Sequence, residues 1–135
     1  MTNQNPRQRT AIRNNRGAMQ IIVLAVIAGL LALFAFYTWL MLSWSYSDGE
    51  RAGYVQKLSR KGWVCKTWEG ELAMVSLPGA MSEIFHFSVR DNAVAQRLNA
   101  VVGKRVALTY AQHVGLPTDC FGETSYFVTE VKVVE

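Results

Sequence analysis

Residues 91–103, with the sequence DNAVAQRLNAVVG, decide the fold, because the hydrophobic pattern becomes helical only here in the second half of the chain. Asp91 is a residue type that caps helices, and Gly103 stands where helices commonly end. We therefore predict a helix over residues 92–102. The apolar residues spaced to share one side of it are Val94, Leu98, Val101 and Val102.

Segments with β-strand patterns lie on both sides of this helix. They are rich in β-branched and aromatic residues, and residues 104–112 alternate with period two. A tight turn at residues 60–62 separates the first two segments, and Glu69-Gly70-Glu71 inside the second predicts a bulge or a sharp coil of the strand. The predicted strands are residues 51–59, 63–76, 83–89, 104–112 and 125–134.

Three strands, one helix and two strands form the element order of the oligonucleotide/oligosaccharide-binding (OB) barrel, a five-stranded Greek-key barrel. The helix between the third and fourth strands is the element that favours it. We therefore predict an OB-like β-barrel domain over residues 51–135. The alternative is a small α+β sheet with the same order of elements.

On the N-terminal side of the predicted domain, residues 19–44 form a 26-residue run without Asp, Glu, Lys or Arg. About 20 residues suffice to cross a bilayer, and a signal peptide would have a shorter apolar region and a small-residue cleavage site. Tyr37, Trp39 and Trp44 near the end of the run predict an anchor at the headgroup level. We therefore predict an uncleaved transmembrane helix, a single-pass signal anchor, with the lipid bilayer as its partner.

The segments beside this helix are polar. Residues 1–18 are rich in Asn, Gln and Arg, which predicts a disordered basic tail, and residues 45–50 form a polar hinge. Within the helix, two pairs of small residues are spaced to let a second helix approach, which suggests a homodimer. These pairs are Ala25 with Gly29 and Ala28 with Ala32.

Positive charge leaves the orientation of the helix nearly balanced. Four arginines precede the helix, and four basic residues occur among the first twenty residues after it. We favour a cytoplasmic N-terminus, because Arg13 and Arg16 lie close to the helix and a long folded domain crosses largely regardless of its charge. The C-terminal domain is then periplasmic or extracellular.

The formal charge of +4 resides in the tail. Residues 45–135 carry ten Lys or Arg against ten Asp or Glu, so the folded domain is formally neutral. A protein that neutralises several phosphates needs a concentrated basic face. Nucleic acid is therefore an unlikely partner, and a protein partner is the expected one.

Cys65 and Cys120 are the only cysteines. Outside the cytoplasm they could form a disulfide, and the alternative is two unpaired thiols. They show no ligand spacing with His86 or His113, so we expect no metal site, and each histidine is expected to be an ordinary structural or surface residue.

Candidate active-site and binding residues lie on the predicted strands. Glu69 and Glu71 share a face, but a solvated strand end explains them better than a catalytic pair, so we expect neither an enzyme nor a cofactor. Five aromatic residues could form a stacking surface for bases or sugars, although we expect at least three of them in the core. They are Tyr54, Trp63, Trp68, Phe85 and Phe87.

The soluble part contains three short motifs: Lys57, Ser59, Lys61 and Gly62, then Lys66-Thr67-Trp68-Glu69-Gly70, and residues 103–106. In these motifs it resembles a family of short, uncharacterised bacterial membrane-anchored proteins, which implies a bacterial inner membrane. Some of those relatives are labelled as phosphogluconate dehydrogenase, but this chain lacks a G-x-G-x-x-G after a strand and is too short for such an enzyme.

Three hypotheses for function follow. The leading one is a membrane-tethered, non-enzymatic binding or scaffold module that acts on a protein or envelope component. The first alternative is a single-stranded nucleic-acid-binding domain on the cytoplasmic side. The second is an envelope hydrolase that uses Glu69 or Glu71.

Overall fold

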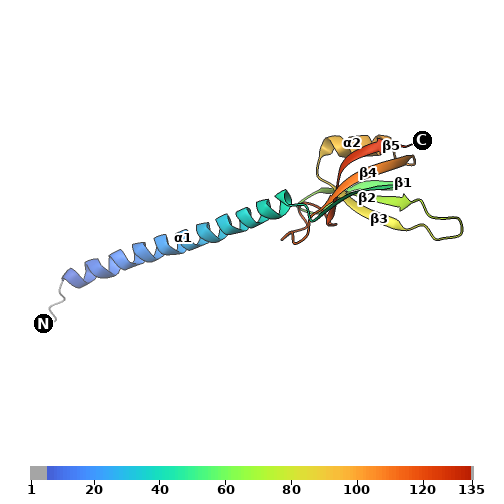
Figure 1. Cartoon of the computed structure of the whole chain (residues 1–135). Coiled ribbons are helices and arrows are strands. Elements are labelled where there is room, and N and C mark those ends of the chain that lie inside the picture. Colours follow the sequence, from blue (N-terminus) through green and yellow to red (C-terminus); the bar gives the residue numbers. More distant parts are fainter. Residues whose placement is uncertain (1–5, 135) are drawn as a thin grey trace. The chain divides into compact units, whose positions relative to one another are not determined.

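The computed structural model describes residues 6–134, with the side chains of residues 15–134. It contains a long N-terminal helix and a β-rich domain that carries a second, short helix (Figure 1). In chain order the elements are α1 (Pro6–Ser43), β1 (Ser47–Lys61), β2 (Thr67–Met74), β3 (Ile84–Val89), α2 (Asn92–Ala100), β4 (Arg105–Gln112) and β5 (Tyr126–Val133).

The chain forms two compact units, Met1–Trp39 and Leu40–Glu135. The segment Asn15–Ser43 of α1 is long and apolar enough to cross a membrane, and its most apolar window is entirely unburied. A helix that is apolar on all sides is typical of a membrane span rather than of a water-exposed surface. This helix has the properties of a membrane anchor or a signal sequence.

α1 begins well before the predicted start at residue 19. Residues 6–18, which we expected to be disordered, continue the helix, whereas residues 1–5 of the expected tail lie outside the described residues. Proline is accepted at the first helical position because its missing N–H has no partner there. Once the apolar segment has nucleated the helix, each added residue contributes one more hydrogen bond, which offsets the low helix propensity of Asn14, Asn15 and Gly17.

The five strands form one closed sheet in the order β1-β2-β3-β5-β4. β1 closes it, because residues 47–54 pair with β4 and residues 53–61 pair with β2. Along the chain, three strands, a helix and two strands occur as predicted. In the sheet, however, β5 lies between β3 and β4, so the strand order there differs from the chain order.

The predicted bulge at residues 69–71 is wrong, because the irregularity lies in β1. The register between β1 and β2 shifts between Val55 and Lys57, while β2 pairs with β3 without interruption. Gly70 serves close packing instead: a Cβ there would lie 2.3 Å from the ring of Phe87, its partner on β3. A glycine inside a strand can mark either a bulge or a place where a neighbouring group packs closely on the backbone.

Two predicted strand boundaries also change. β1 begins at Ser47, inside the predicted hinge, because residues 47–50 pair with the end of β4. β2 begins at Thr67 rather than at Trp63, since the preceding residues form the loop after Gly62. The tight turn predicted at residues 60–62 is wrong, because β1 continues to Lys61, which pairs with Thr67, and the chain turns over residues 62–66 instead. Gly62 begins this loop with a positive φ of 129°.

α2 begins as predicted, since the side chain of Asp91 accepts a hydrogen bond from the N–H of Ala93 at 2.8 Å. It ends at Ala100, and Val102 of the predicted apolar side is exposed because it lies beyond the helix. The buried apolar side chains of the sheet and α2 form one core. Its members are Val55, Leu72, Phe85, Phe87, Val89, Val94, Ala95, Leu98, Val106, Leu108 and Val128.

Candidate functional site

The structure does not gather the five predicted surface aromatics into a stacking platform. Phe85 and Phe87 are buried core residues, because alternation along β3 points them inward. Their burial agrees with the expectation that most of the five belong to the core, and it removes these two from any binding surface. Trp68 packs partly against the core and donates a hydrogen bond through Nε1 to Asn92 Oδ1 at 3.0 Å. Tyr54 is half exposed, and Trp63 is fully exposed on a loop. Only two of the five thus present open ring surface.

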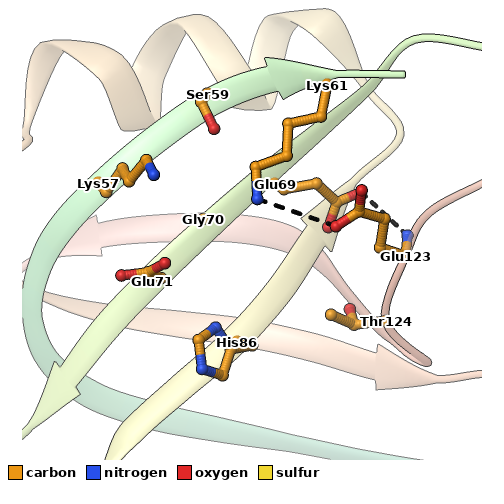
Figure 2. Close-up of a pocket in the computed structure, with 9 residues that line it drawn as sticks. All are labelled: Lys57, Ser59, Lys61, Glu69, Gly70, Glu71, His86, Glu123 and Thr124. Carbon is orange, nitrogen blue, oxygen red and sulfur yellow. Dashed lines mark hydrogen bonds and ion pairs between the residues drawn. The ribbon is translucent and has the colours of Figure 1, made fainter. Parts of the chain in front are cut away.

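A polar groove of about 220 Å³ instead occupies the outer face of β1, β2 and β3 (Figure 2). The shift after Val55 reverses which side chains of β1 point outward, and bulges commonly re-aim side chains in this way. As predicted, Glu69 and Glu71 share one face, and both line the groove. The lining residues are Lys57, Ser59, Lys61, Glu69, Gly70, Glu71, His86, Glu123 and Thr124.

Glu69 is a buried carboxylate that is engaged at both oxygens. Glu69 as a whole residue is only 6% exposed to solvent. Oε1 accepts hydrogen bonds from Thr67 Oγ1 at 2.7 Å and from the backbone N–H of Glu123 at 3.0 Å, and Oε2 accepts from Ser88 Oγ at 2.7 Å. A buried carboxylate needs such donors to offset its lost hydration. Glu69 therefore ties residue 123 to the sheet.

The segment around Glu123 fits closely over the outer face of β3. The N–H of Thr124 donates to Ser88 Oγ at 3.1 Å, and Thr124 Oγ1 donates to the carbonyl of Tyr126 at 3.0 Å. A Cβ on Gly122 would lie 2.6 Å from that of Ser88, so only glycine allows this approach. Glu123 and Thr124 of this segment thereby become part of the groove lining.

The open part of the groove carries mixed charge. Lys57, Glu71 and His86 are cross-strand partners in one row over three strands. Lys61 and Glu123 form an ion pair at 3.9 Å, with both side chains about half exposed, so it contributes little stability. Such a surface can contact a polar partner of either sign.

Cys65 and Cys120 form a disulfide, with their Cα atoms 4.9 Å apart. It joins the loop between β1 and β2 to the loop between β4 and β5. Beside it lies a second pocket of about 230 Å³, which Cys120 lines together with basic and aromatic side chains. Among the described residues, no three His, Cys, Asp or Glu side chains are arranged to hold a metal ion.

Sequence reasoning missed Arg51. Its guanidinium lies 4.5 Å from the ring centroid of Phe85 and within 6 Å of those of Tyr110 and Tyr126, distances typical of cation–π contacts. Nη1 also donates to Met74 Sδ at 3.5 Å. No sequence signal marked this residue, because the three rings come from three different strands.

His113 is structural, as predicted for an ordinary histidine, but its role was not foreseen. It is buried, and Nδ1 lies 3.2 Å from the carbonyl oxygen of Met41 and 3.0 Å from that of Trp44. Carbonyls only accept hydrogen bonds, so Nδ1 carries the proton. Carbonyl groups at the end of a helix lack the backbone N–H of a later helical residue as a hydrogen-bond donor. In the unit that starts at Leu40, the ring of His113 supplies a donor to the carbonyls of Met41 and Trp44.

Residues 44–135 match the model of a family described as a domain of unknown function, DUF8785. The chain belongs to this family. No curated protein matches the chain. The matched region is the second structural unit without its first four residues.

Solved structures similar to the chain include the mitochondrial single-stranded DNA binding protein Rim1 from S. cerevisiae. It shares 9% sequence identity with a TM-score of 0.48, over 68% of this chain and 98% of that chain. At this level of similarity nothing about its ligand transfers to the present chain. Neither match supports the bacterial origin or the dehydrogenase label of the resembling proteins.

Proposed function

We propose that this protein is a membrane-tethered, non-enzymatic binding module. α1 remains attached as the anchor, and the domain after it lies outside the cytoplasm, where its outer groove contacts a protein or an envelope component. The predicted bacterial inner membrane and the predicted homodimer through α1 belong to this proposal. The exposed surface of residues 19–43 of α1, a stretch without Asp, Glu, Lys or Arg, supports the tether.

The disulfide is the observation that carries the proposal. Disulfides persist in oxidising compartments and are rare in the cytoplasm, where thiols are kept reduced. A Cys65–Cys120 bond therefore favours the orientation with the N-terminal arginines inside and the domain outside. The same bond argues against a nucleic-acid-binding role on the cytoplasmic side.

The barrel type supports a binding role. We infer an OB-like barrel, because the closed order β1-β2-β3-β5-β4, with a helix between β3 and β4, is the order expected of that class. Such barrels bind ligands on the face of strands 2 and 3 and with the loops after strands 1 and 4. In this chain the polar groove occupies that face, and the disulfide joins those two loops.

The geometry of the groove favours binding over hydrolysis. Both oxygens of Glu69 already accept hydrogen bonds from within the domain, which leaves Glu71 as the freer carboxylate on the strand. A hydrolase of envelope glycans needs two available carboxylates. Contact with a polar partner needs only the row of exposed Lys57, half-buried Glu71 and exposed His86.

The orientation is tested with reporters fused to the C-terminus of the full chain, one active only outside the cytoplasm and one only inside. We expect activity of the outside reporter, a carbonate-resistant membrane association, and cysteines that react with alkylating reagents only after reduction. An active inside reporter with free thiols would overturn the proposal in favour of the nucleic-acid-binding alternative.

The binding role is tested by crosslinking in intact cells and affinity purification of the full chain. We expect a recovered partner that is lost when Lys57→Glu and Glu71→Lys reverse the charges of the groove. Lys104→Glu is the matched control, since Lys104 is exposed but lies outside the groove. Recovery that is equal for both variants would count against the groove as the binding surface.

A further inference from the structure

The loop between β1 and β2 presents two apolar side chains to solvent. Trp63 is fully exposed and Val64 is 95% exposed. The loop is nevertheless constrained, because Cys65 is cross-linked to Cys120 and Gly62 packs directly on the carbonyl of Cys65. Large apolar groups held in water on a constrained loop indicate a contact surface.

Three basic side chains surround the base of this loop. Arg60, Lys66 and Arg90 line the second pocket, and no acidic residue lines it. Arg60 lies 5.9 Å from the ring centroid of Trp68, and Arg90 lies 5.9 Å from that of Phe121. Within the described part of the chain, none of the three cations forms an ion pair. The pocket therefore has an uncompensated positive charge suited to an anion.

The loop is also connected to the part of the domain where α1 attaches. Cys120, its disulfide partner, lies seven residues after His113, whose ring contacts the carbonyls of Met41 and Trp44. Seven extended residues span at most about 25 Å. The exposed loop thus lies within reach of the point at which the chain leaves the predicted membrane span.

We propose that residues 62–66 form a membrane-docking loop that binds anionic phospholipid. Trp63 and Val64 enter the headgroup region, where amphipathic aromatic rings are favoured, and Arg60, Lys66 and Arg90 hold a headgroup phosphate. This inference rests on the membrane tether of the proposed function. It adds a lipid-binding site that would orient the groove over the bilayer surface.

The neighbouring groove argues for a single headgroup over a nucleic-acid strand. Glu71 and Glu123 alternate in the groove lining with Lys57 and Lys61, so the outer face of the sheet offers no continuous basic path to a polyanion. The basic pocket is local and lies at one end. A phosphate on a short headgroup occupies the basic pocket without having to follow the groove of mixed charge.

The experiment uses the full chain reconstituted in vesicles that contain lipids brominated on the acyl chains, which quench nearby tryptophans. The contribution of Trp63 is the fluorescence of the parent minus that of Trp63→Phe. We expect strong quenching of this contribution in phosphatidylglycerol vesicles and weaker quenching in phosphatidylcholine vesicles. High salt should reduce the difference, since it screens exposed charges.

Two variants make the result specific. Each basic residue near an anionic surface favours docking about fivefold, so Arg60→Gln with Lys66→Gln and Arg90→Gln should lower the docked-to-undocked ratio on the order of a hundredfold. The matched control is Leu77→Trp in the Trp63→Phe background, because Leu77 is 82% exposed on the loop between β2 and β3. We expect no quenching at residue 77.

The outcomes separate this inference from the tether. Absence of Trp63 quenching, equal quenching in the two lipids, or equal quenching at residue 77 overturns the docking loop while the protein still floats with the vesicles. Release of Trp63 by inorganic phosphate, but not by sodium chloride of the same ionic strength, identifies a soluble phosphate ligand and also overturns the docking loop. Failure to float means that the tether itself is wrong.

Discussion

Two loops of the domain expose apolar side chains, yet they differ in their nearby charge and in whether a disulfide holds them. Residues 62–66, between β1 and β2, carry Trp63 and Val64, a disulfide and adjacent cations. Residues 75–83, between β2 and β3, expose Leu77 and Met81 but contain no Lys or Arg and no cysteine. Exposure alone therefore does not identify a functional surface.

The hydrogen bonds of the two loops show the same contrast. The second loop is held by local contacts, in which the N–H of Ala80 donates to the carbonyl of Leu77 at 3.0 Å and Ser76 Oγ donates to that of Met81 at 3.3 Å. The first loop is linked by Cys65 to a distant part of the chain. Evidence for a site lies in these long-range constraints, because a loop that merely connects two strands does not need them.

The largest expected effect comes from removing the disulfide. Cys65→Ser with Cys120→Ser should lower the free energy of unfolding by about 4 kcal/mol, the chain-entropy estimate for a 55-residue separation. Urea unfolding of the full chain in detergent measures this change. A reductant should destabilise the parent by a similar amount and leave the double variant unaffected; equal stability of parent and variant would remove the main difference between the loops.

A smaller loss is expected from the buried carboxylate that holds residue 123. Glu69→Gln should lower the free energy of unfolding by about 2 kcal/mol, because the amide nitrogen cannot accept the hydrogen bonds now made to one carboxylate oxygen. Glu71→Gln is the control on the same strand and should change it by less than about 0.5 kcal/mol. Similar losses for both variants would contradict the structural role of Glu69.

Local signals in the sequence were sufficient for several elements. The start of α2 follows from Asp91 as its cap, and β4 follows from strict alternation over residues 105–112. A sequence shows such features because the physical cause lies within a few residues of the effect. The prediction that Glu69 and Glu71 share a face succeeded for the same reason.

The parts that failed depend on contacts between distant residues. β1 extends into the predicted hinge because Ser47 pairs with Gln112, and Gly70 is required by the ring of Phe87 on another strand. The sequence could not decide whether Cys65 and Cys120 pair, since that depends on how two loops meet. Burial of Glu69 likewise depends on the backbone of residue 123.

Gly122 offers a sharper test of how closely the chain packs beside the disulfide. Gly122→Ala should lower the free energy of unfolding by about 1–2 kcal/mol, because its Cβ would overlap with Ser88 and with the ring of Phe127. Gly17→Ala is a control in open space on α1, where alanine favours the helix. Thermal unfolding followed by circular dichroism distinguishes the two, and an unchanged Gly122→Ala would show that the loop is not held against β3.

The smallest effects on stability are expected at the exposed tips themselves. Trp63→Ala and Leu77→Ala should each change the free energy of unfolding by less than about 0.5 kcal/mol, because neither side chain packs against the core. Only Trp63→Ala should weaken the contact with anionic lipid. A loss of more than about 1 kcal/mol on Trp63→Ala would mean that the ring packs within the domain, and the contrast between the two loops would then concern stability rather than binding.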